Sequence, residues 1–347
     1  MSRKAHCLLS VVVPCYNEEE VIGATHERLI AVLGNQPEVD LEIVYVDDGS
    51  RDRTEAILNE LAHTDARVNV ISFARNFGHQ PAVSAGLAYA SGEAVAIIDA
   101  DLQDPPEVVV DMLERWRGGY DVVYGVRTKR KEGVFKRIAY SSFYRLYSNL
   151  ANIDVPIDSG DFALMDRRVV DVLNSLPEKN RFVRGLRAWA GFRQTGCVYE
   201  RQARHAGETK YPLLKLIKLA SDGIFNFSTK PLSLIFLLGM FTALASMLAA
   251  AIYLASYLFE FSIFGQPPGD VPGFTTLILT LLFFSGVQLM SIGILGEYLG
   301  RIYQETKMRP TYVVRSVRGP LATQPSAGAT VNLVGRSIPE HVDVTLV

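Results

Sequence analysis

The chain has 347 residues, of which 48% are hydrophobic and 21% charged, and its formal net charge is −2. A net charge this close to zero argues against nucleic-acid binding, because nucleic-acid-binding domains carry a broad basic surface. The length suffices for about two domains. Cys7, Cys15 and Cys197 are odd in number and irregularly spaced, which favours free thiols in a reducing cytoplasm over disulfides or a zinc site.

Short β-branched runs alternate with helical stretches over the first part of the chain. Strands are predicted at residues 8–13, 41–46, 68–73, 94–98 and 121–126, and helices at 18–33, 53–61, 81–89 and 106–116. This alternation predicts an α/β fold with a mostly parallel sheet, in a domain that covers residues 1–210. A Gly-rich dinucleotide fingerprint and a Walker loop are both missing, which weakens a dehydrogenase or P-loop kinase interpretation.

Apolar residues then recur with helical spacing around Lys215, Lys218 and Asp222. The pattern predicts a juxtamembrane amphipathic helix over residues 211–230. A helix packed on the sheet of a soluble domain has the same pattern and stays an alternative.

Two long uncharged stretches follow, at residues 231–259 and 271–296. Each exceeds the roughly 20 apolar residues that span a bilayer, so two transmembrane helices are predicted, at about 231–259 and 271–300. Two core helices of a soluble domain are the alternative, but such helices normally carry a polar stripe.

The loop between the two stretches, residues 260–270, lacks Lys and Arg, whereas both flanking regions contain several. The positive-inside rule therefore places the first domain and both termini in the cytoplasm, at an inner membrane. No signal peptide is expected, because the apolar run at 8–13 is too short for one. Residues 301–347 are expected to form a cytoplasmic tail, loosely attached or disordered from residue 319 onward.

Polar residues follow each of the first four predicted strands. They lie at 14–19, 47–52, 75–78 and 99–104. Asn17 and Ser50 could each simply cap a helix. Because ligands of open α/β sheets bind at the carboxyl ends of the strands, the four segments together predict a single site.

The acidic run at 99–104 reads Asp-Ala-Asp-Leu-Gln-Asp. Asp99 and Asp101 stand at alternate positions of a turn, where both can approach one hard divalent cation and leave room for substrate phosphates. A solvated acidic turn is the alternative for such a triplet taken alone.

The ordered segments resemble the family 2 glycosyltransferases of GT-A fold, and within them the polyprenyl-phosphate glycosyltransferases, which include bactoprenol glucosyltransferases and dolichol-phosphate mannose synthases. The resemblance covers about residues 8–310. It rests on Val-Pro-Cys-Tyr-Asn-Glu-Glu at 13–19, Val-Asp-Asp-Gly-Ser at 46–50, the acidic run at 99–104, Gly-Asp-Phe at 160–162, the Arg204 to Pro212 segment and Gly-Glu-Tyr-Leu-Gly-Arg at 296–301. Two spans after the catalytic domain match the bactoprenol type.

The resemblance implies roles for single residues. The donor nucleotide-sugar would be bound by Pro14, Tyr16, Asn17, Glu18, Asp47, Asp48, Arg75, Asp99, Gln103, Arg204 and Lys210. Asp99, Asp101 and Gln103 would hold Mg²⁺ or Mn²⁺, with Asp101 also counted as catalytic. Arg75 could instead be an ordinary surface residue, and Arg204 and Lys210, together with Arg201, match less sharply defined family positions.

The resemblance assigns the acceptor phosphate to Arg127, Arg137 and Ser141. Guanidinium groups match phosphate oxygens bidentately. The neighbouring lysines could equally attract anionic lipid head groups.

Asp161, with Asp158 in reserve, is the expected catalytic carboxylate, in a Gly-Asp-Phe turn past the sheet. A phosphate monoester has its second pKa near about 6, so it is largely dianionic at neutral pH and needs no strong base. Asp161 is therefore expected to orient groups rather than to accept a proton. A purely structural role in the turn is the alternative.

The residues and the resemblance together predict an inverting enzyme that transfers a hexose to undecaprenyl phosphate, with glucose from UDP-glucose as the favoured donor group and the membrane as a partner. The family resemblance suggests a homotetramer. Alternatives within enzymes are a dolichol-phosphate mannose synthase-like use of GDP-mannose, and transfer of an aminoarabinose. A non-catalytic membrane scaffold is weakened by the retained carboxylates, and a flippase by the lack of charge inside the spans.

Overall fold

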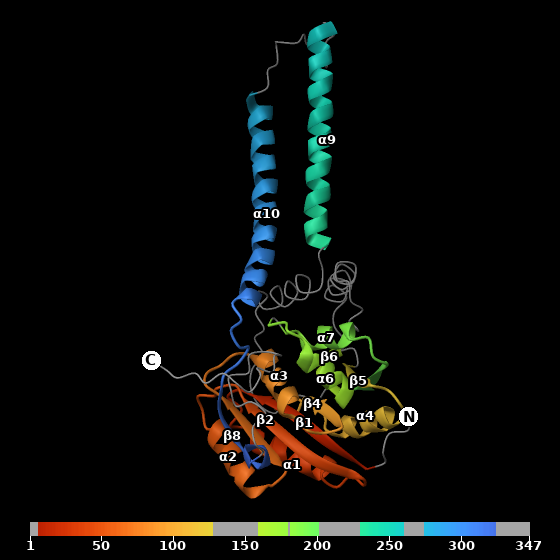
Figure 1. Cartoon of the computed structure of the whole chain (residues 1–347), viewed down its shortest axis with the longest axis vertical. Helices are drawn as coiled ribbons and strands as arrows, with labels where there is room; N and C mark the ends of the chain where they lie inside the picture. The colour runs from red at the N-terminus through yellow and green to blue at the C-terminus, as the bar shows by residue number, and fades with distance from the viewer. Residues whose placement is uncertain (1–5, 128–158, 180, 201–229, 260–273, 324–347) are drawn as a thin grey trace, which may run out of the picture. The chain divides into compact units, whose positions relative to one another are not determined.

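The computed structural model describes residues 6–127, 159–179, 181–200, 230–259 and 274–323. The chain divides into two compact units, and each is described by itself (Figure 1). The first comprises residues 1–148, 153–216 and 307–347, and the second comprises residues 149–152 and 217–306. The predicted juxtamembrane helix at 211–230 lies almost wholly outside the described residues.

In the first unit the described residues form an eight-stranded sheet, in the order β7-β5-β6-β4-β1-β2-β3-β8. Strand β6 runs antiparallel to both of its neighbours, β8 runs antiparallel to β3, and the other pairs are parallel. The strands are β1 (Cys7–Cys15), β2 (Val39–Asp47), β3 (Val68–Phe73), β4 (Ala94–Ile97), β5 (Val122–Arg127), β6 (Ser159–Asp166), β7 (Gln194–Tyr199) and β8 (Val314–Arg318).

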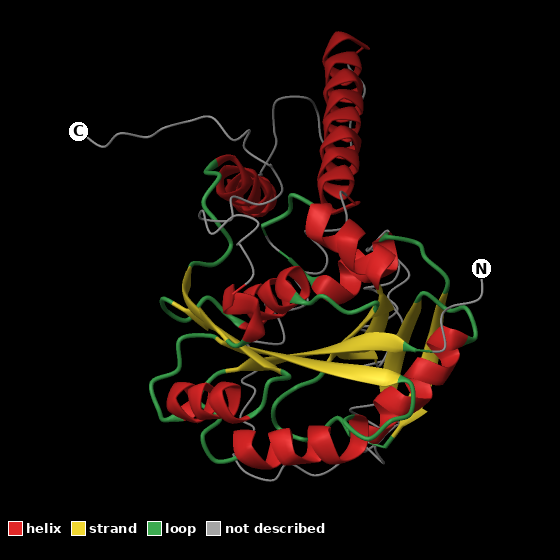
Figure 2. Cartoon of the chain, turned by 60° about the horizontal axis from the view of Figure 1, so that its bottom comes forward, coloured by secondary structure: helices red, strands yellow, loops and turns green. Residues whose placement is uncertain are grey.

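Helices cover both faces of this sheet (Figure 2). One face carries α1 (Ile22–Leu33), α2 (Thr54–Thr64) and α4 (Glu107–Arg117). The other carries α3 (His79–Tyr89), α6 (Arg167–Ser175) and α7 (Val183–Trp189), which contact one another. Strands buried on both faces explain why the sequence shows continuous apolar runs instead of alternation.

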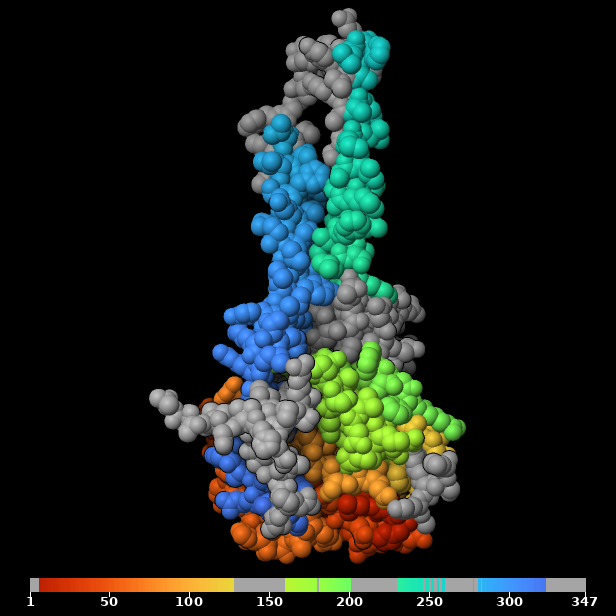
Figure 3. Space-filling view, viewed as in Figure 1, coloured from red at the N-terminus to blue at the C-terminus, as the bar shows by residue number. Residues whose placement is uncertain are grey.

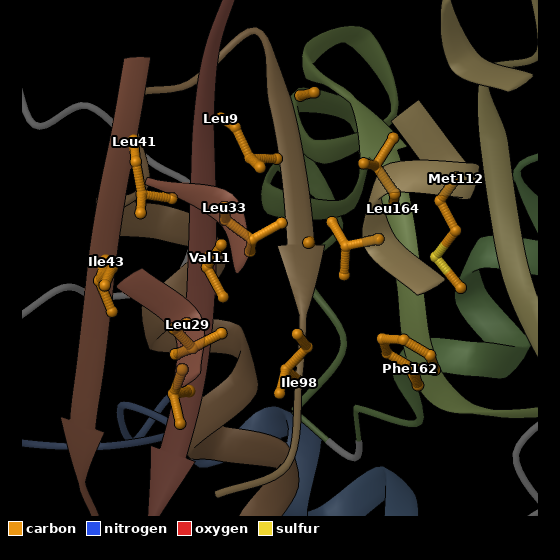
Figure 4. Close-up of a cluster of buried hydrophobic side chains, with 14 of the residues drawn as sticks. Leu9, Val11, Leu29, Leu33, Leu41, Ile43, Ile98, Met112, Phe162 and Leu164 are labelled. Carbon is orange, nitrogen blue, oxygen red and sulfur yellow. The ribbon is translucent and has the colours of Figure 1, made fainter. Parts of the chain in front are cut away.

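The main core lies between the sheet and the α1, α2 and α4 layer. Side chains from two helices and several strands meet there, as Figure 4 shows: Leu9, Val11, Leu29, Leu33, Leu41, Ile43, Ile98, Met112, Phe162 and Leu164. Burial of this apolar surface is the main stabilising contribution to the unit.

All five predicted strands and four predicted helices of the first part are present, with ends shifted by a few residues. The expected turn at residues 160–162 is wrong, because these residues lie inside β6. Ala163, Leu164 and Met165 pair with both neighbouring strands. Phe162 and Leu164 belong to the main core whereas Ala163 and Met165 do not, which is the alternation of a strand. Strands β7 and β8 and helices α6 and α7 were not predicted.

Strand β8 comes from the segment that was expected to be a tail. It pairs with β3, and the Tyr312 ring stacks on Phe73 with centroids 5.0 Å apart. Arg315 and Glu55 form an ion pair of 2.5 Å, and a 3-10 helix, Pro320–Thr323, ends the described segment. The sheet of the first unit therefore includes chain from beyond the long helices.

The second unit contains two long helices, α9 (Lys230–Phe259) and α10 (Phe274–Thr306) (Figure 3). Many of their apolar side chains are exposed. Among the described residues, one stretch has the length and hydropathy needed to cross a membrane, Lys230–Ala249 of α9. This stretch lies in the first predicted span. The second predicted span overlaps α10, and its crossing stays a prediction.

A substitution at Gly86 tests how closely α3 packs against β1. A Cβ at Gly86 would lie 2.1 Å from Val12 Cγ1, whereas a Cβ at Gly23 in α1 would meet nothing within 4 Å. Gly86→Ala should therefore destabilise the protein by about 1–3 kcal/mol through overpacking. Gly23→Ala is the matched control and should be neutral or slightly stabilising.

Thermal unfolding of the two variants measures the difference. Val12→Ala added to Gly86→Ala should recover part of the lost stability. Equal melting temperatures for Gly86→Ala and Gly23→Ala would show that α3 does not pack as closely as described.

Candidate active site

The polar segments converge on one edge of the sheet. The carboxyl ends of β1, β2, β3, β4, β5 and β7 share this edge, because these strands all run in the same direction. Since β6 runs the opposite way, its first residues reach the same edge. Ile97 pairs with Ala163, so continuing the register by two residues places Asp99 opposite Asp161.

The loops after β1 and β2 are tied together by hydrogen bonds. The backbone N–H of Asn17 donates to Ser50 Oγ at 3.0 Å, and Asn17 Oδ1 accepts from the Arg51 N–H at 2.8 Å. The Glu18 N–H donates to Thr54 Oγ1 at 2.8 Å. Asn17 thus has a structural role in fixing this pair of loops, and Tyr16, 39% exposed, lies beside it.

Asp48 joins the β2 loop to the loop after β3. Its two carboxylate oxygens accept from the N–H groups of Phe77 and Gly78 at 2.6 and 2.8 Å. A Cβ at Gly49 would lie 2.5 Å from the Arg75 carbonyl carbon, so glycine is required for this close approach. Arg75 lies on its own loop, with its guanidinium 4.1 Å from the Phe77 ring.

The acidic run forms a tight turn. Asp101 Oδ1 accepts from the Gln103 N–H at 3.1 Å, and Leu102 between them has φ 56°, an uncommon conformation for leucine. Burial raises the pKa of Asp99 to about 6, and the carboxylates of Asp104, Asp161 and Asp101 add to the rise. Neighbouring carboxylates repel one another when they ionise, and a bound cation would reduce that repulsion.

The described residues contain no group of three His, Cys, Asp or Glu side chains able to hold a metal ion. The predicted set has two carboxylates and an amide, and Mg²⁺ is commonly held by one or two carboxylates together with substrate phosphates. The chemistry of this set is compatible with a cation whose coordination a bound phosphate completes, and Asp99, Asp101 and Gln103 stay predicted ligands.

Asp161 has cationic and N–H neighbours on both oxygens. Gln80 Nε2 donates to Oδ2 at 2.8 Å, His79 Nε2 lies 3.4 Å from Oδ2, and Arg184 Nε lies 3.7 Å from Oδ1. Burial opposes ionisation, but the His79 hydrogen bond and the charge of Arg184 outweigh it and hold the Asp161 pKa well below its usual range. These neighbours favour the ionised form of Asp161, which makes it a poor proton acceptor.

Arg187 adds a fully buried cation near Asp161. Its side chain is 1% exposed, and no guanidinium nitrogen has a hydrogen-bond partner in the described part of the chain. Burial lowers its pKa to about 10, and the charge of Asp161 opposes that shift. An uncompensated buried charge is costly, so Asp161 serves as a counter-charge that makes Arg187 tolerable.

Arg127 ends β5 beside the buried side chains of Tyr199 and Asp104. Its Nε donates to the Tyr199 hydroxyl oxygen at 3.2 Å, and the Tyr199 hydroxyl donates to Asp104 Oδ1. Burial and the Asp104 carboxylate raise the pKa of Tyr199 well above its usual value, so the phenol keeps its proton. The Arg127 side chain is 34% exposed and thus remains accessible at the edge.

The structure brings twelve predicted site residues to this edge: Pro14, Tyr16, Asn17, Glu18, Asp47, Asp48, Arg75, Asp99, Asp101, Gln103, Arg127 and Asp161. The others, Arg137, Ser141, Asp158, Arg204 and Lys210, lie outside the described residues.

Six residues at this edge were not predicted as site residues: His79, Gln80, Asp104, Arg184, Arg187 and Tyr199. Asp104 was within the quoted acidic run, and His79 and Gln80 directly follow Gly78. Arg184 and Arg187 are three residues apart in a helix, a spacing that places them on one face. Tyr199 carried no local signal.

Asp48→Asn tests the link between the loops after β2 and β3. An amide offers one acceptor oxygen, so one of the two half-buried N–H groups loses its carboxylate partner, at a cost of about 1–3 kcal/mol. Melting temperature should fall, and the affinity for a nucleotide-sugar should weaken with the loosened loop. Asp40→Asn, on the exposed start of the same strand, is the control and should change stability by less than about 0.5 kcal/mol. Unchanged melting of Asp48→Asn would contradict the described bonds.

Comparison with known proteins identifies the family of this chain. The family model for glycosyl transferase family 2 matches residues 10–173. The uncharacterized glycosyltransferase YkcC of Bacillus subtilis is 50% identical over 92% of this chain and 96% of its own length. The bactoprenol glucosyl transferase of Shigella phage SfV is 42% identical over 89% of this chain and 98% of its own.

Among solved structures, glucosyl-3-phosphoglycerate synthase of Mycobacterium tuberculosis is similar at 23% identity, with a TM-score of 0.44 over 64% of this chain and 79% of that chain. The full-length relatives decide the family, since the similarity extends through the sheet, the site and the two long helices. The predicted resemblance is confirmed: the chain is a glycosyltransferase and belongs to glycosyl transferase family 2.

Proposed function

We propose that this enzyme transfers glucose from UDP-glucose to undecaprenyl phosphate, with inversion at the anomeric carbon. Support comes from the 42% identity, over nearly the whole chain, to proteins named bactoprenol glucosyl transferases. The observation that carries the proposal is the meeting of two kinds of phosphate-binding group at one edge. Arg127 Nη2 lies 4.0 Å from Asp104, the last residue of the acidic run.

The donor would lie along the loops after β1 to β4, with Tyr16, Asp47 and Asp48 near the nucleoside. A divalent cation bound with Asp99, Asp101 and Gln103 would offset the negative charge that develops on the leaving diphosphate. The turn around Leu102, closed by the hydrogen bond from the Gln103 N–H to Asp101, would hold these side chains in place before the donor arrives. Such preorganisation lowers the cost of charge development in the transition state.

The acceptor phosphate would bind to Arg127, with Arg137 and Ser141 as further contacts. A phosphate monoester is largely dianionic near neutral pH and attacks without losing a proton. Asp161 would orient the cations around it, because its own pKa is held too low for proton transfer. Direct in-line attack by the phosphate oxygen accounts for the inversion.

Residues 230–249 of α9 can cross a membrane, which suits a lipid acceptor. We further propose that α10 crosses in the opposite sense, with the catalytic unit on the cytoplasmic side. A homotetramer, as the family resemblance suggests, completes this proposal.

The purified protein, assayed with undecaprenyl phosphate and a panel of UDP- and GDP-sugars, tests the proposed substrates. UDP-glucose should give a lipid-linked glucose at the highest kcat/KM. Preferential use of GDP-mannose, or of a UDP-linked aminoarabinose, would replace the proposed donor with one of the alternatives.

Asp101→Asn tests the metal role. Loss of a cation ligand should remove several kcal/mol of transition-state stabilisation, or roughly 10²–10³-fold in kcat. Circular dichroism and the melting temperature should stay close to those of the wild type. Wild-type protein that keeps full activity in EDTA would contradict a metal-dependent reaction.

Asp161→Asn tests the orienting role. We expect kcat to fall by about 10²-fold, because small misplacements of reacting groups cost that much. The folded Asp161 pKa is depressed, so the carboxylate is ionised both at neutral pH and in mild acid. The loss should therefore be equal from pH 5 to 9. An acidic limb present in the wild-type rate profile and absent from the variant would identify Asp161 as a general base.

A further inference from the structure

Asp104 and Tyr199 form a buried pair behind Arg127 that the proposed chemistry does not yet use. Asp104 is 1% exposed and Tyr199 is 5% exposed. Arg127 and Tyr199 are paired residues at the ends of two parallel strands, β5 and β7. Arg127, Tyr199 and Asp104 are thus connected in series from the edge of the sheet into its interior.

Two glycines make room for this arrangement. A Cβ at Gly125 would lie 2.7 Å from both the Phe162 and the Tyr199 rings, and these two rings contact each other edge to face at 5.2 Å. A Cβ at Gly160 would lie 3.1 Å from Arg127 Nη2. The guanidinium therefore lies over β6 in a space that a larger residue would narrow.

The direction of the hydrogen bonds is fixed by chemistry. The Tyr199 hydroxyl donates to Asp104 Oδ1, so the lone pairs of the hydroxyl oxygen are available to Arg127. Arg127 Nε then donates to that oxygen. Nη2 also lies 4.0 Å from Asp104 Oδ1, which is an ion-pair distance and too long for a hydrogen bond. The two terminal nitrogens can therefore still donate to a second partner, and that fork matches two oxygens of a phosphate.

We propose that Tyr199 and Asp104 are positioning residues that orient Arg127 for the phosphate of the lipid acceptor. The inference rests on the proposed acceptor role of Arg127. Neither residue touches the acceptor itself. They hold the flexible Arg127 side chain in one conformation before the phosphate binds, so less side-chain entropy is lost on binding. This raises the affinity for the acceptor phosphate about 3- to 10-fold.

Tyr199→Phe is the direct test, because it keeps the ring packed on Phe162 and removes only the hydroxyl. The apparent KM for undecaprenyl phosphate should rise about 3- to 10-fold. The KM for the nucleotide-sugar and the kcat at saturating lipid should stay unchanged. A merely structural role would affect both substrates or the melting temperature instead.

Tyr120→Phe is the matched control, since Tyr120 precedes β5 at the opposite edge of the sheet and loses the same hydroxyl. It should leave both KM values unchanged. Asp104→Asn is a second variant, in case Tyr199→Phe proves unstable. It leaves the Tyr199 ring in place but weakens the hydrogen bond that the Tyr199 hydroxyl donates to residue 104. The KM for the lipid should therefore rise selectively.

Arg127→Lys separates this inference from the function it rests on. Lysine cannot form the planar fork, so the lipid KM should rise selectively, and adding Tyr199→Phe to it should cost little more. Equal effects of Arg127→Lys on both substrates would overturn the acceptor role of Arg127, and the inference with it. A selective effect of Arg127→Lys with none from Tyr199→Phe and Asp104→Asn would overturn the inference alone.

Discussion

The balance of charge at the carboxyl edge of the sheet is the constraint on which the site depends. Asp99 and Asp161 stand opposite each other at this edge, yet their environments differ. The Asp99 pKa is raised to about 6 by burial and neighbouring carboxylates, whereas that of Asp161 is held low by His79 and Arg184. Two carboxylates with opposite shifts are suited to different tasks. One environment favours a cation, and the other keeps a fixed negative charge among arginines.

The antiparallel strand β6 makes this balance possible. It enters the sheet between β4 and β5 and brings Asp161 to the edge where the parallel strands end. Successive residues of β6 make different contacts. Asp161 contacts residues of α3 and α7, while the neighbouring Gly160 leaves room for Arg127. The proposed donor groups after β4 and the acceptor group on β5 are thus held on the two sides of β6 in one sheet, which favours precise positioning.

Local sequence patterns were sufficient to predict the parallel part of the fold. The β-branched runs and the helices between them identified β1 to β5 and α1 to α4, and the place of Asp99 after a strand followed directly. The turn at 160–162 was misjudged because Phe162 and Leu164 alternate over too few residues to distinguish strand from turn. Tyr199 meets Arg127 only through the register of β7 on β5, and β8 returns to β3 after two long helices. Pairings this distant in sequence are set by tertiary packing.

The central claim is that the lipid phosphate and the metal-bound diphosphate meet at this edge. The ³¹P relaxation rate of a short-chain polyprenyl phosphate, measured on protein with bound Mn²⁺ and UDP, reports that proximity. Strong Mn²⁺-dependent relaxation, lost in Asp101→Asn, is the predicted result. A lipid phosphate that binds the protein but relaxes at the same rate with Mn²⁺ as with Mg²⁺ would contradict a shared site.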